Sequence, residues 1–272
     1  MLVGGVAAGV FGSLLGLGGG VLIVPLLTLG FGLDLRPAVG VSLIAVIVTS
    51  SAAAGVYLER NIANLRLGMT LELFTAVGAL VGGLIAFLVD ERWLSLLFAA
   101  LLAYVAFTMA RPRTTRASDD ARPGNVPGPE PLDPPGLRAA AAARLSGDEY
   151  AIRNIGRGIA GSAGAGVLSA LLGIGGGIVK VPLMHLSMGV PMRIATATSN
   201  LMIGITAAAS AVIYLFRGEI DPYVAGPTAI GVFVGASIGS RVAHRVDLRL
   251  LRGLFVVVLL YTAVQMLIRG LT

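Results

Sequence analysis

The amino-acid sequence predicts an all-α polytopic membrane protein built from two homologous repeats. Of the 272 residues, 56% are hydrophobic and 12% are charged, and the mean hydropathy is +0.89. The few charges gather between long apolar stretches, a composition for which a lipid bilayer is the suitable solvent. The second half of the chain also repeats much of the first half.

Eight apolar stretches lack any charged residue, and each is a candidate for one crossing of the bilayer. A helix needs roughly 17 to 25 residues to cross the hydrocarbon, and all eight stretches approach or exceed that length. Because they are rich in Leu, Ala and Gly and lack the polar alternation of a membrane barrel, we expect helices and not strands. The stretches cover residues 1–33, 37–58, 73–89, 93–110, 158–179, 194–216, 222–240 and 253–268.

The net charge of +6 comes from arginine, because 19 of the 20 basic residues are Arg and one is Lys180. In a membrane protein this is typical of positive-inside anchoring and not of nucleic-acid binding. The chain has no cysteine, which excludes disulfides, thiol catalysis and Cys-ligated metals. It also lacks an HExxH motif and a GxSG motif with a partner histidine, so we expect no enzyme activity, no metal and no cofactor.

Two long segments of the chain match each other at an offset of 157 residues. Residues 4–60 align with 161–217 without a gap and with 24 identities in 57 positions, centred on GLGGGVLIVPLL and GIGGGIVKVPLM. The same offset returns near the end of each repeat, and between the two matches we interpret the register as slipping by four residues. We expect a first membrane repeat at 1–110, a linker at 111–157 and a second membrane repeat at 158–272.

The linker is rich in proline and charge. Such a segment cannot bury enough apolar surface to form a core, so we expect a solvated connector. Its eight arginines predict that it lies in the cytoplasm. They are Arg111, Arg113, Arg116, Arg122, Arg138, Arg144, Arg153 and Arg157.

The first apolar stretch of each repeat is too long for one straight crossing and carries three glycines, followed by Pro25 or Pro182. Glycine costs about 1 kcal/mol and proline about 3 kcal/mol in a helix interior, so we expect a glycine-broken or re-entrant segment. If this segment enters and leaves on one side of the membrane, each repeat has three further transmembrane helices and the repeats are inverted. Eight plain crossings leave 12 arginines inside and 7 outside, whereas six crossings with two re-entrant hairpins give 15 and 4, which favours inversion.

Inverted repeats with broken helices are the architecture of secondary transporters, whose substrates bind near the midplane. The glycine triplets suit an anion, because a ligand can approach their backbone amides and the helix dipole favours negative charge. Close packing of helices through small residues is the alternative interpretation. The candidate residues are Gly18, Gly19 and Gly20 in the first repeat and Gly175, Gly176 and Gly177 in the second.

Lys180 replaces Ile23 of the first repeat, and a lysine inside an apolar segment is a functional candidate because its burial is costly. We interpret it as attracting or gating an anion, with snorkelling to the cytoplasmic surface as the alternative. His185 is interpreted as a proton relay or as a local hydrogen-bonding group. Glu72, at the start of the third apolar stretch, is expected at the membrane interface.

The segment after each glycine motif carries hydroxyl side chains in matching positions. Ser42 and Thr49 are two helical turns apart on one face, as are their counterparts Ser199 and Thr206. Neutral polar groups can bind an oxyanion without trapping it, and the alternative is hydrogen bonding between helices. The full set of candidates is Ser42, Thr49, Thr198, Ser199, Asn200 and Thr206.

The duplicated G-x-G-G-G-x-x-x-V-P motif, the A-T-S-N segment and the central hydrophilic linker resemble the sulfite exporter TauE/SafE family. The likeness covers residues 4–110 and 161–268. It implies a plasma-membrane transporter of sulfur-containing anions such as sulfite, sulfoacetate or other organosulfonates. The family pattern falls on Gly16, Gly18 to Gly20, Val24 and Pro25, on Gly173, Gly175 to Gly177, Val181 and Pro182, and on Thr198, Ser199 and Asn200.

We therefore expect a multi-pass secondary transporter that exports small sulfur-containing anions across the plasma membrane, the inner membrane of a bacterium. A passive anion channel and a non-transporting membrane scaffold or assembly factor are the alternatives. The expected partners are the small anionic substrate and the lipid bilayer. A homodimer is compatible with the sequence, and no nucleic-acid partner is expected.

Overall fold

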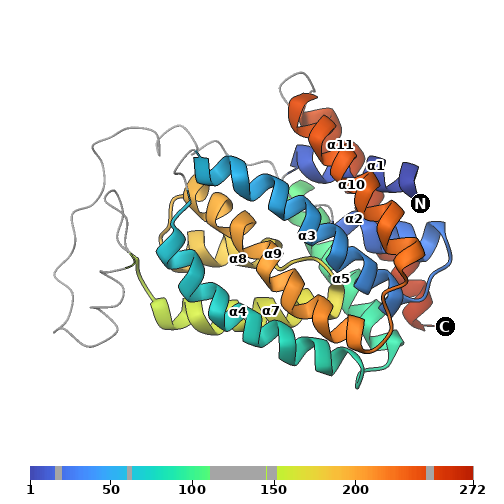
Figure 1. Cartoon of the computed structure of the whole chain (residues 1–272), viewed down its shortest axis with the longest axis horizontal. Helices are drawn as coiled ribbons and strands as arrows, with labels where there is room; N and C mark the ends of the chain where they lie inside the picture. Colours follow the sequence, from blue (N-terminus) through green and yellow to red (C-terminus); the bar gives the residue numbers. More distant parts are fainter. Residues whose placement is uncertain (16–19, 60–62, 111–144, 146–151, 243–247, 272) are drawn as a thin grey trace.

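The computed structural model describes residues 1–15, 20–59, 63–110, 145, 152–242 and 248–271. Within these residues every regular element is a helix, which confirms the all-α class (Figure 1). In the described part of the chain, five helices are long and apolar enough to cross a membrane, namely Leu65–Ala86, Glu91–Ala110, Ile155–Leu172, Ile194–Phe216 and Pro222–Gly239. Most of the predicted linker lies outside the described residues. The first described helix after the linker begins at Ile155.

The two repeats contain the same succession of helices. The first repeat consists of α1 (Leu2–Leu15), α2 (Gly20–Pro25), a π-helical turn η1 (Leu26–Gly30), α3 (Leu35–Glu59), α4 (Leu65–Ala86) and α5 (Glu91–Ala110). The second consists of α7 (Ile155–Leu172), α8 (Gly177–Pro182), η2 (Leu183–Ser187), α9 (Met192–Phe216), α10 (Pro222–Val242) and α11 (Leu248–Leu271). From α2 to α5, every helix starts 157 residues before its counterpart, which shows the duplication at the level of structure.

The helices of the two repeats are interleaved. The most extensive packing pairs α1 with α10, α4 with α7, α5 with α11, and α3 with α9 (Figure 1). Exchanging the two repeats leaves this pattern of pairs unchanged. The structure therefore contains two mixed halves. One, called the α4 half, consists of α4, α7, α8 and α9, and the other, called the α10 half, consists of α10, α1, α2 and α3.

Glycines allow the closest of these helix pairs to pack backbone against backbone. A Cβ on Gly166 of α7 would lie 2.0 Å from the Thr75 carbonyl oxygen of α4, and one on Gly9 of α1 would lie 2.3 Å from the Val232 carbonyl oxygen of α10. Small residues of this kind let membrane helices approach closely. The two contacts are equivalent, because Gly9 and Gly166 are 157 residues apart and so are Thr75 and Val232. The register between the repeats is therefore unchanged here, and the predicted four-residue slip is wrong. The helix contacts preserve the register where side-chain identity is low.

The equivalent helices α3 and α9 run antiparallel. Near the start of α3, a Cβ on Gly40 would lie 3.4 Å from the Tyr214 ring at the end of α9, whereas a Cβ on Gly204 would meet the Ser50 side chain further along α3. The guanidinium groups of Arg36 and Arg217 both lie over the Phe87 ring, at 5.6 and 5.0 Å. The beginning of α3 and the end of α9 thus share one end of the molecule.

The glycine-rich segment of the second repeat folds back as a helical hairpin. Helix α7 ends at Leu172, and Gly173, Gly175 and Gly176 have φ of 69°, 75° and 76°, a conformation that favours glycine. Helix α8 then returns along α7, so that the Arg153 amide donates to the Met188 carbonyl at 3.0 Å. The predicted break is confirmed here. It lies at the glycines, because the chain continues through Pro182 into η2.

The first repeat has a related hairpin. A Cβ on Gly4 of α1 would lie 2.9 Å from the Leu26 side chain, as one on Gly161 of α7 would lie 2.6 Å from Leu183. Residues 16–19 lie outside the described residues, and with them the predicted site glycines Gly18 and Gly19.

Candidate functional site

Lys180 is a buried charge in the interior of the helical bundle. It lies on α8, only 1% exposed, and its Nζ is 2.9 Å from Glu72 Oε2. The Nζ also donates a hydrogen bond to Thr206 Oγ1. Because the ammonium group is enclosed and paired, the interpretation of Lys180 as a snorkelling residue is wrong.

The partner of Lys180 is Glu72 on α4. We expected Glu72 at the membrane interface, and the structure buries it between helices with 3% exposure. The Thr206 hydroxyl on α9 accepts from Lys180 and donates to Glu72 Oε1 at 2.6 Å. Three helices thus contribute one residue each to a closed ring of charge-assisted hydrogen bonds. Such bonds are stronger than neutral ones, and the ring leaves no net charge in the interior. We call these residues the Glu72–Lys180–Thr206 cluster.

The other half of the molecule shows that the fold does not require this charge pair. At the offset of 157 residues, the counterparts of Lys180, Glu72 and Thr206 are Ile23, Ala229 and Thr49. Ile23 is fully buried at its position. A buried ion pair is often replaceable by apolar residues without loss of stability, so its presence in one half only suggests a functional role.

Two buried serine hydroxyls lie beside the glycine break and next to the cluster. Ser199 Oγ on α9 is 3.6 Å from the position of a Cβ on Gly177, and Ser169 Cβ on α7 is 3.4 Å from that of a Cβ on Gly176. The Lys180 side chain borders the same glycine, with Cε at 3.5 Å from the Gly176 position. Ser169, Ser199 and the more distant Ser162 of α7 have no hydrogen-bond partner among the described residues. A buried hydroxyl without a partner is unusual and is suited to a polar ligand.

Ser42, Thr49 and Thr198 have structural partners. Ser42 donates to the Gly173 carbonyl at 2.8 Å, and Thr49 donates to the Ala45 carbonyl of its own helix at 3.1 Å. Thr198 accepts a hydrogen bond from the Asn64 amide at 3.0 Å, where α4 begins. Asn200, which also lies on α9, is half-buried.

Three of the predicted glycines match the packing interpretation. A Cβ on Gly20 would lie 2.7 Å from Val46, and one on Gly175 or on Gly177 would lie 2.5 Å from Ile203. His185 Nδ1 lies 3.0 Å from the Val190 carbonyl oxygen, which agrees with the interpretation of His185 as a local hydrogen-bonding group. The structure therefore brings together Gly176, Gly177, Lys180, Ser199 and Thr206 out of the predicted set.

Sequence reasoning missed Glu72, Ser162 and Ser169. Glu72 is the only acidic residue between Glu59 and Asp90, and it was the one carboxylate in that apolar region able to balance an intramembrane lysine. Ser162 and Ser169 are seven residues apart, which places them two turns apart on one face of α7. The serines correspond to Gly5 and Gly12 in the first repeat, so the duplication itself gave no signal for them.

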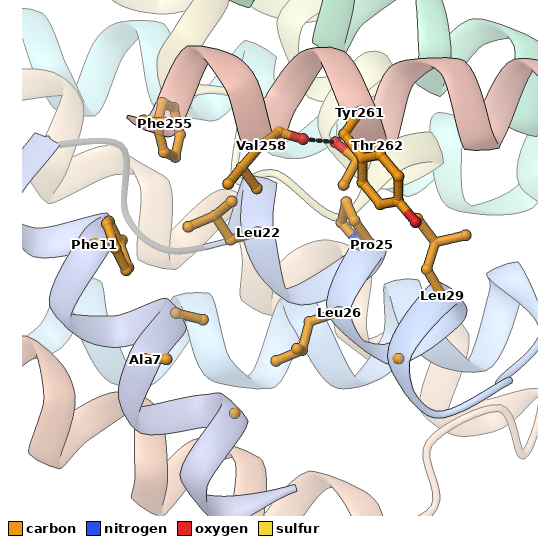
Figure 2. A pocket seen from close by; sticks show the side chains of 13 residues that line it. Ala7, Phe11, Leu22, Pro25, Leu26, Leu29, Phe255, Val258, Tyr261 and Thr262 are labelled. Carbon is orange, nitrogen blue, oxygen red and sulfur yellow. Dashed lines mark hydrogen bonds between the residues drawn. The ribbon is translucent and has the colours of Figure 1, made fainter. Parts of the chain in front are cut away.

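A separate apolar pocket of about 370 Å³ lies between α1, α2, η1 and α11 (Figure 2). Figure 2 shows Phe11, Leu22 and Val258 pointing into it, and the Thr262 hydroxyl is occupied by a bond of 2.9 Å to the Val258 carbonyl. No charged residue lines this pocket, and it shares no residue with the cluster. Its chemistry is that of an apolar surface and not of an anion site.

The chain is similar to known membrane transporters. A family model described as sulfite exporter TauE/SafE matches residues 1–266. A "probable membrane transporter protein" of Bacillus subtilis is 24% identical over 279 residues, covering 100% of this chain and 97% of the relative. Relatives of the same description from Xylella fastidiosa and Methanocaldococcus jannaschii are 26% and 25% identical, covering 86% and 93% of this chain and 80% and 88% of the relatives. These relatives are named as transporters and not as enzymes, and no solved structure matches the chain.

Proposed function

Because the chain belongs to the sulfite exporter TauE/SafE family, we propose that it exports small sulfur-containing anions, such as sulfite or organosulfonates, across the plasma membrane. The observation that carries this proposal is the pair of unpartnered hydroxyls of Ser169 and Ser199 beside the glycine break and the cluster. Hydroxyls and backbone amides in an apolar surrounding can replace the hydration of an oxyanion. They carry no full positive charge that would hold the anion permanently.

The proposed substrate site therefore lies on the α4 half, between α7, α8 and α9. Gly176, with a φ of 76°, breaks the helix there and turns its backbone beside Ser169 and Lys180. Ser169, Ser199 and Thr206 supply hydroxyls. Lys180, Gly175, Thr198 and Asn200 complete the second-repeat candidates. In the first repeat the Ser42 hydroxyl is already bonded to the Gly173 carbonyl, so the substrate is proposed to bind to the second repeat.

We propose that the repeats are inverted in the membrane. The antiparallel packing of α3 and α9 supports this, because equivalent helices that cross a bilayer in opposite directions belong to repeats of opposite orientation. Arg36 and Arg217 lie at one end of the bundle, where both approach Phe87. Arg269 at the end of α11 donates to the Leu33 carbonyl near that same end. These three belong to the arginines that the inverted arrangement places outside.

The proposed topology predicts that equivalent positions face opposite sides of the membrane. Arg66 at the start of α4 and Tyr223 at the start of α10 are separated by 157 residues and are both exposed. Single cysteines can be placed there without background, because the chain contains no cysteine. In intact cells, an impermeant maleimide should label Tyr223→Cys and should label Arg66→Cys only after the membrane is opened. Labelling of both variants from the same side would contradict inversion.

We further propose that the moving bodies are the two mixed halves and not the two sequence repeats. Helix α4 packs on α7 and α9 of the other repeat, just as α10 packs on α1 and α3. The α4 half and the α10 half meet mainly through α3 and α9. Rocking of one half against the other would expose a site beside α9 alternately to each side, which is the usual geometry of secondary transport.

Counterflow in proteoliposomes tests the proposed function. A carrier of sulfite or sulfonate shows stimulation of radiolabelled uptake by substrate inside the vesicle. A passive channel shows flux without this stimulation, and a scaffold shows neither, so either result would overturn the proposal.

Replacing Ser199 with alanine tests the proposed site. A hydrogen bond to a charged ligand contributes about 1.5 kcal/mol or more, so Ser199→Ala should weaken sulfite binding roughly tenfold in equilibrium titrations of purified protein. Ser42→Ala is the matched control, because the equivalent Ser42 hydroxyl is already bonded to Gly173. It should leave the affinity unchanged. Equal effects of the two substitutions would remove Ser199 from the site.

A further inference from the structure

The Glu72–Lys180–Thr206 cluster contains its own anion. Lys180 Nζ bonds to Glu72 and Thr206, and each oxygen of the Glu72 carboxylate accepts one of the hydrogen bonds of the ring. The charge of Lys180 is therefore already neutralised by Glu72. An anion bound at Gly176, Ser169 and Ser199 can pair with the Lys180 ammonium only when the Glu72 carboxylate no longer neutralises that charge.

We infer that Glu72 is an internal competitor of the transported anion, and that anion binding at Lys180 is linked to the uptake of one proton by Glu72. This inference rests on the proposed function. Two negative groups beside a single buried lysine would leave an unbalanced charge in the interior, which is strongly unfavourable. A protonated Glu72 removes that charge, and its hydroxyl can then donate to Thr206 Oγ1, which reverses the hydrogen bond that Thr206 donates to the carboxylate.

The charges of the site balance under this exchange. The empty site holds one ammonium and one carboxylate, and the loaded site holds one ammonium, one monovalent anion and one neutral carboxylic acid. Both states are neutral, so neither requires an uncompensated charge among apolar side chains. In the empty state Glu72 takes the place of the substrate. The carrier is thereby stable without an anion and can return between transport cycles.

No other buried carboxylate or amine competes for this role among the described residues. Glu72 and Lys180 are the only buried charged side chains there. Toward Glu72, α8 contributes Lys180 and α9 contributes Thr206, while the buried polar residues of α7 are Ser162 and Ser169. The other charged residues of α4, α7 and α9 lie near helix ends, namely Arg66, Arg157, Arg193 and Arg217. His185 of η2 is bonded to the Val190 carbonyl.

The asymmetry between the two halves predicts the number of protons. The α10 half has Ile23 and Ala229 in the places of Lys180 and Glu72, so it holds no equivalent pair. One anion should therefore bind with one proton. For a monovalent sulfonate the transported complex is then electrically neutral, and its movement follows the anion and proton gradients but not the membrane potential.

Proton uptake during titration with methanesulfonate tests this inference. Methanesulfonate is a suitable probe because its own charge is constant near neutral pH. In weakly buffered detergent solution, the wild-type protein should take up about one proton per anion bound, and its affinity should rise about tenfold per pH unit of acidification. Glu72→Gln retains the shape and hydrogen-bonding capacity of the side chain. This variant should bind without proton uptake and with an affinity independent of pH.

Two further variants complete the test. Glu91→Gln, at the start of α5 and outside the site, should take up protons like the wild type. If Glu72→Gln does not fold, the charge-balanced double variant Glu72→Ala with Lys180→Ile, titrated with enough methanesulfonate to offset its weaker affinity, should bind the anion without proton uptake. Binding of methanesulfonate to the wild type without proton uptake, or uptake retained in Glu72→Gln, overturns the inference while leaving transport intact. Absence of both sulfite and sulfonate binding would overturn the proposed function itself.

Discussion

Replacing Lys180 with isoleucine should destabilise the protein by about 3 to 5 kcal/mol, because the substitution leaves the Glu72 carboxylate buried without its partner. Glu72→Ala should have an effect of similar size for the opposite charge. The double variant should recover most of the loss, since it installs the residues that the other half carries at Ile23 and Ala229. The free energy of unfolding in detergent, followed through the single tryptophan, Trp93, provides the measurement.

The same double variant separates stability from function. It should fold, but it lacks the lysine that the proposed substrate site uses, so its affinity for sulfite should fall by roughly ten- to a hundredfold. A matched control is Ile23→Val in the α10 half, which trims one methylene group in an equivalent apolar position and should cost about 1 kcal/mol without affecting binding. Additive destabilisation by Lys180→Ile and Glu72→Ala would contradict the pairing, because interacting residues must show a coupling energy.

Replacing Gly166 with alanine should separate α7 from α4 and destabilise the protein by about 3 kcal/mol. The added Cβ would lie 2.0 Å from the Thr75 carbonyl oxygen, and neither backbone can move without opening the helix pair. Overpacking of a tight interface typically costs about 1 to 3 kcal/mol, and a clash with backbone lies at the upper end of this range. Thermal unfolding of the purified variant in detergent is the measurement.

Gly164 provides the control for this prediction. It lies on the same helix two residues away, is exposed, and has nothing within 4 Å of an added Cβ. Gly164→Ala should be neutral or should stabilise α7 by about 0.5 to 1 kcal/mol, because alanine favours the helix. If both substitutions have the same effect, the close approach of α4 and α7 is not what stabilises the bundle.

Much of the architecture was determined by the sequence itself. The apolar stretches predicted the helices, and the glycine triplet of the second repeat predicted the break between Leu172 and Gly177. These signals are local, because they depend on the length of apolar segments and on the conformational freedom of glycine. The repeat was also visible in the sequence, because residues 4–60 and 161–217 share 24 identical positions, which include the glycines and the proline of the broken segment.

The tertiary structure decided which of the candidate residues can act together. Ser42 and Ser199 occupy equivalent positions in the sequence, yet the Ser42 hydroxyl is bonded to Gly173 and the Ser199 hydroxyl has no partner among the described residues. Glu72 and Lys180 are 108 residues apart, and only the packing of α4 and α8 against α9 brings them together. Groups on neighbouring helices decide whether a hydroxyl is hydrogen-bonded or a charge is paired. The position of a residue in the sequence does not specify those neighbours.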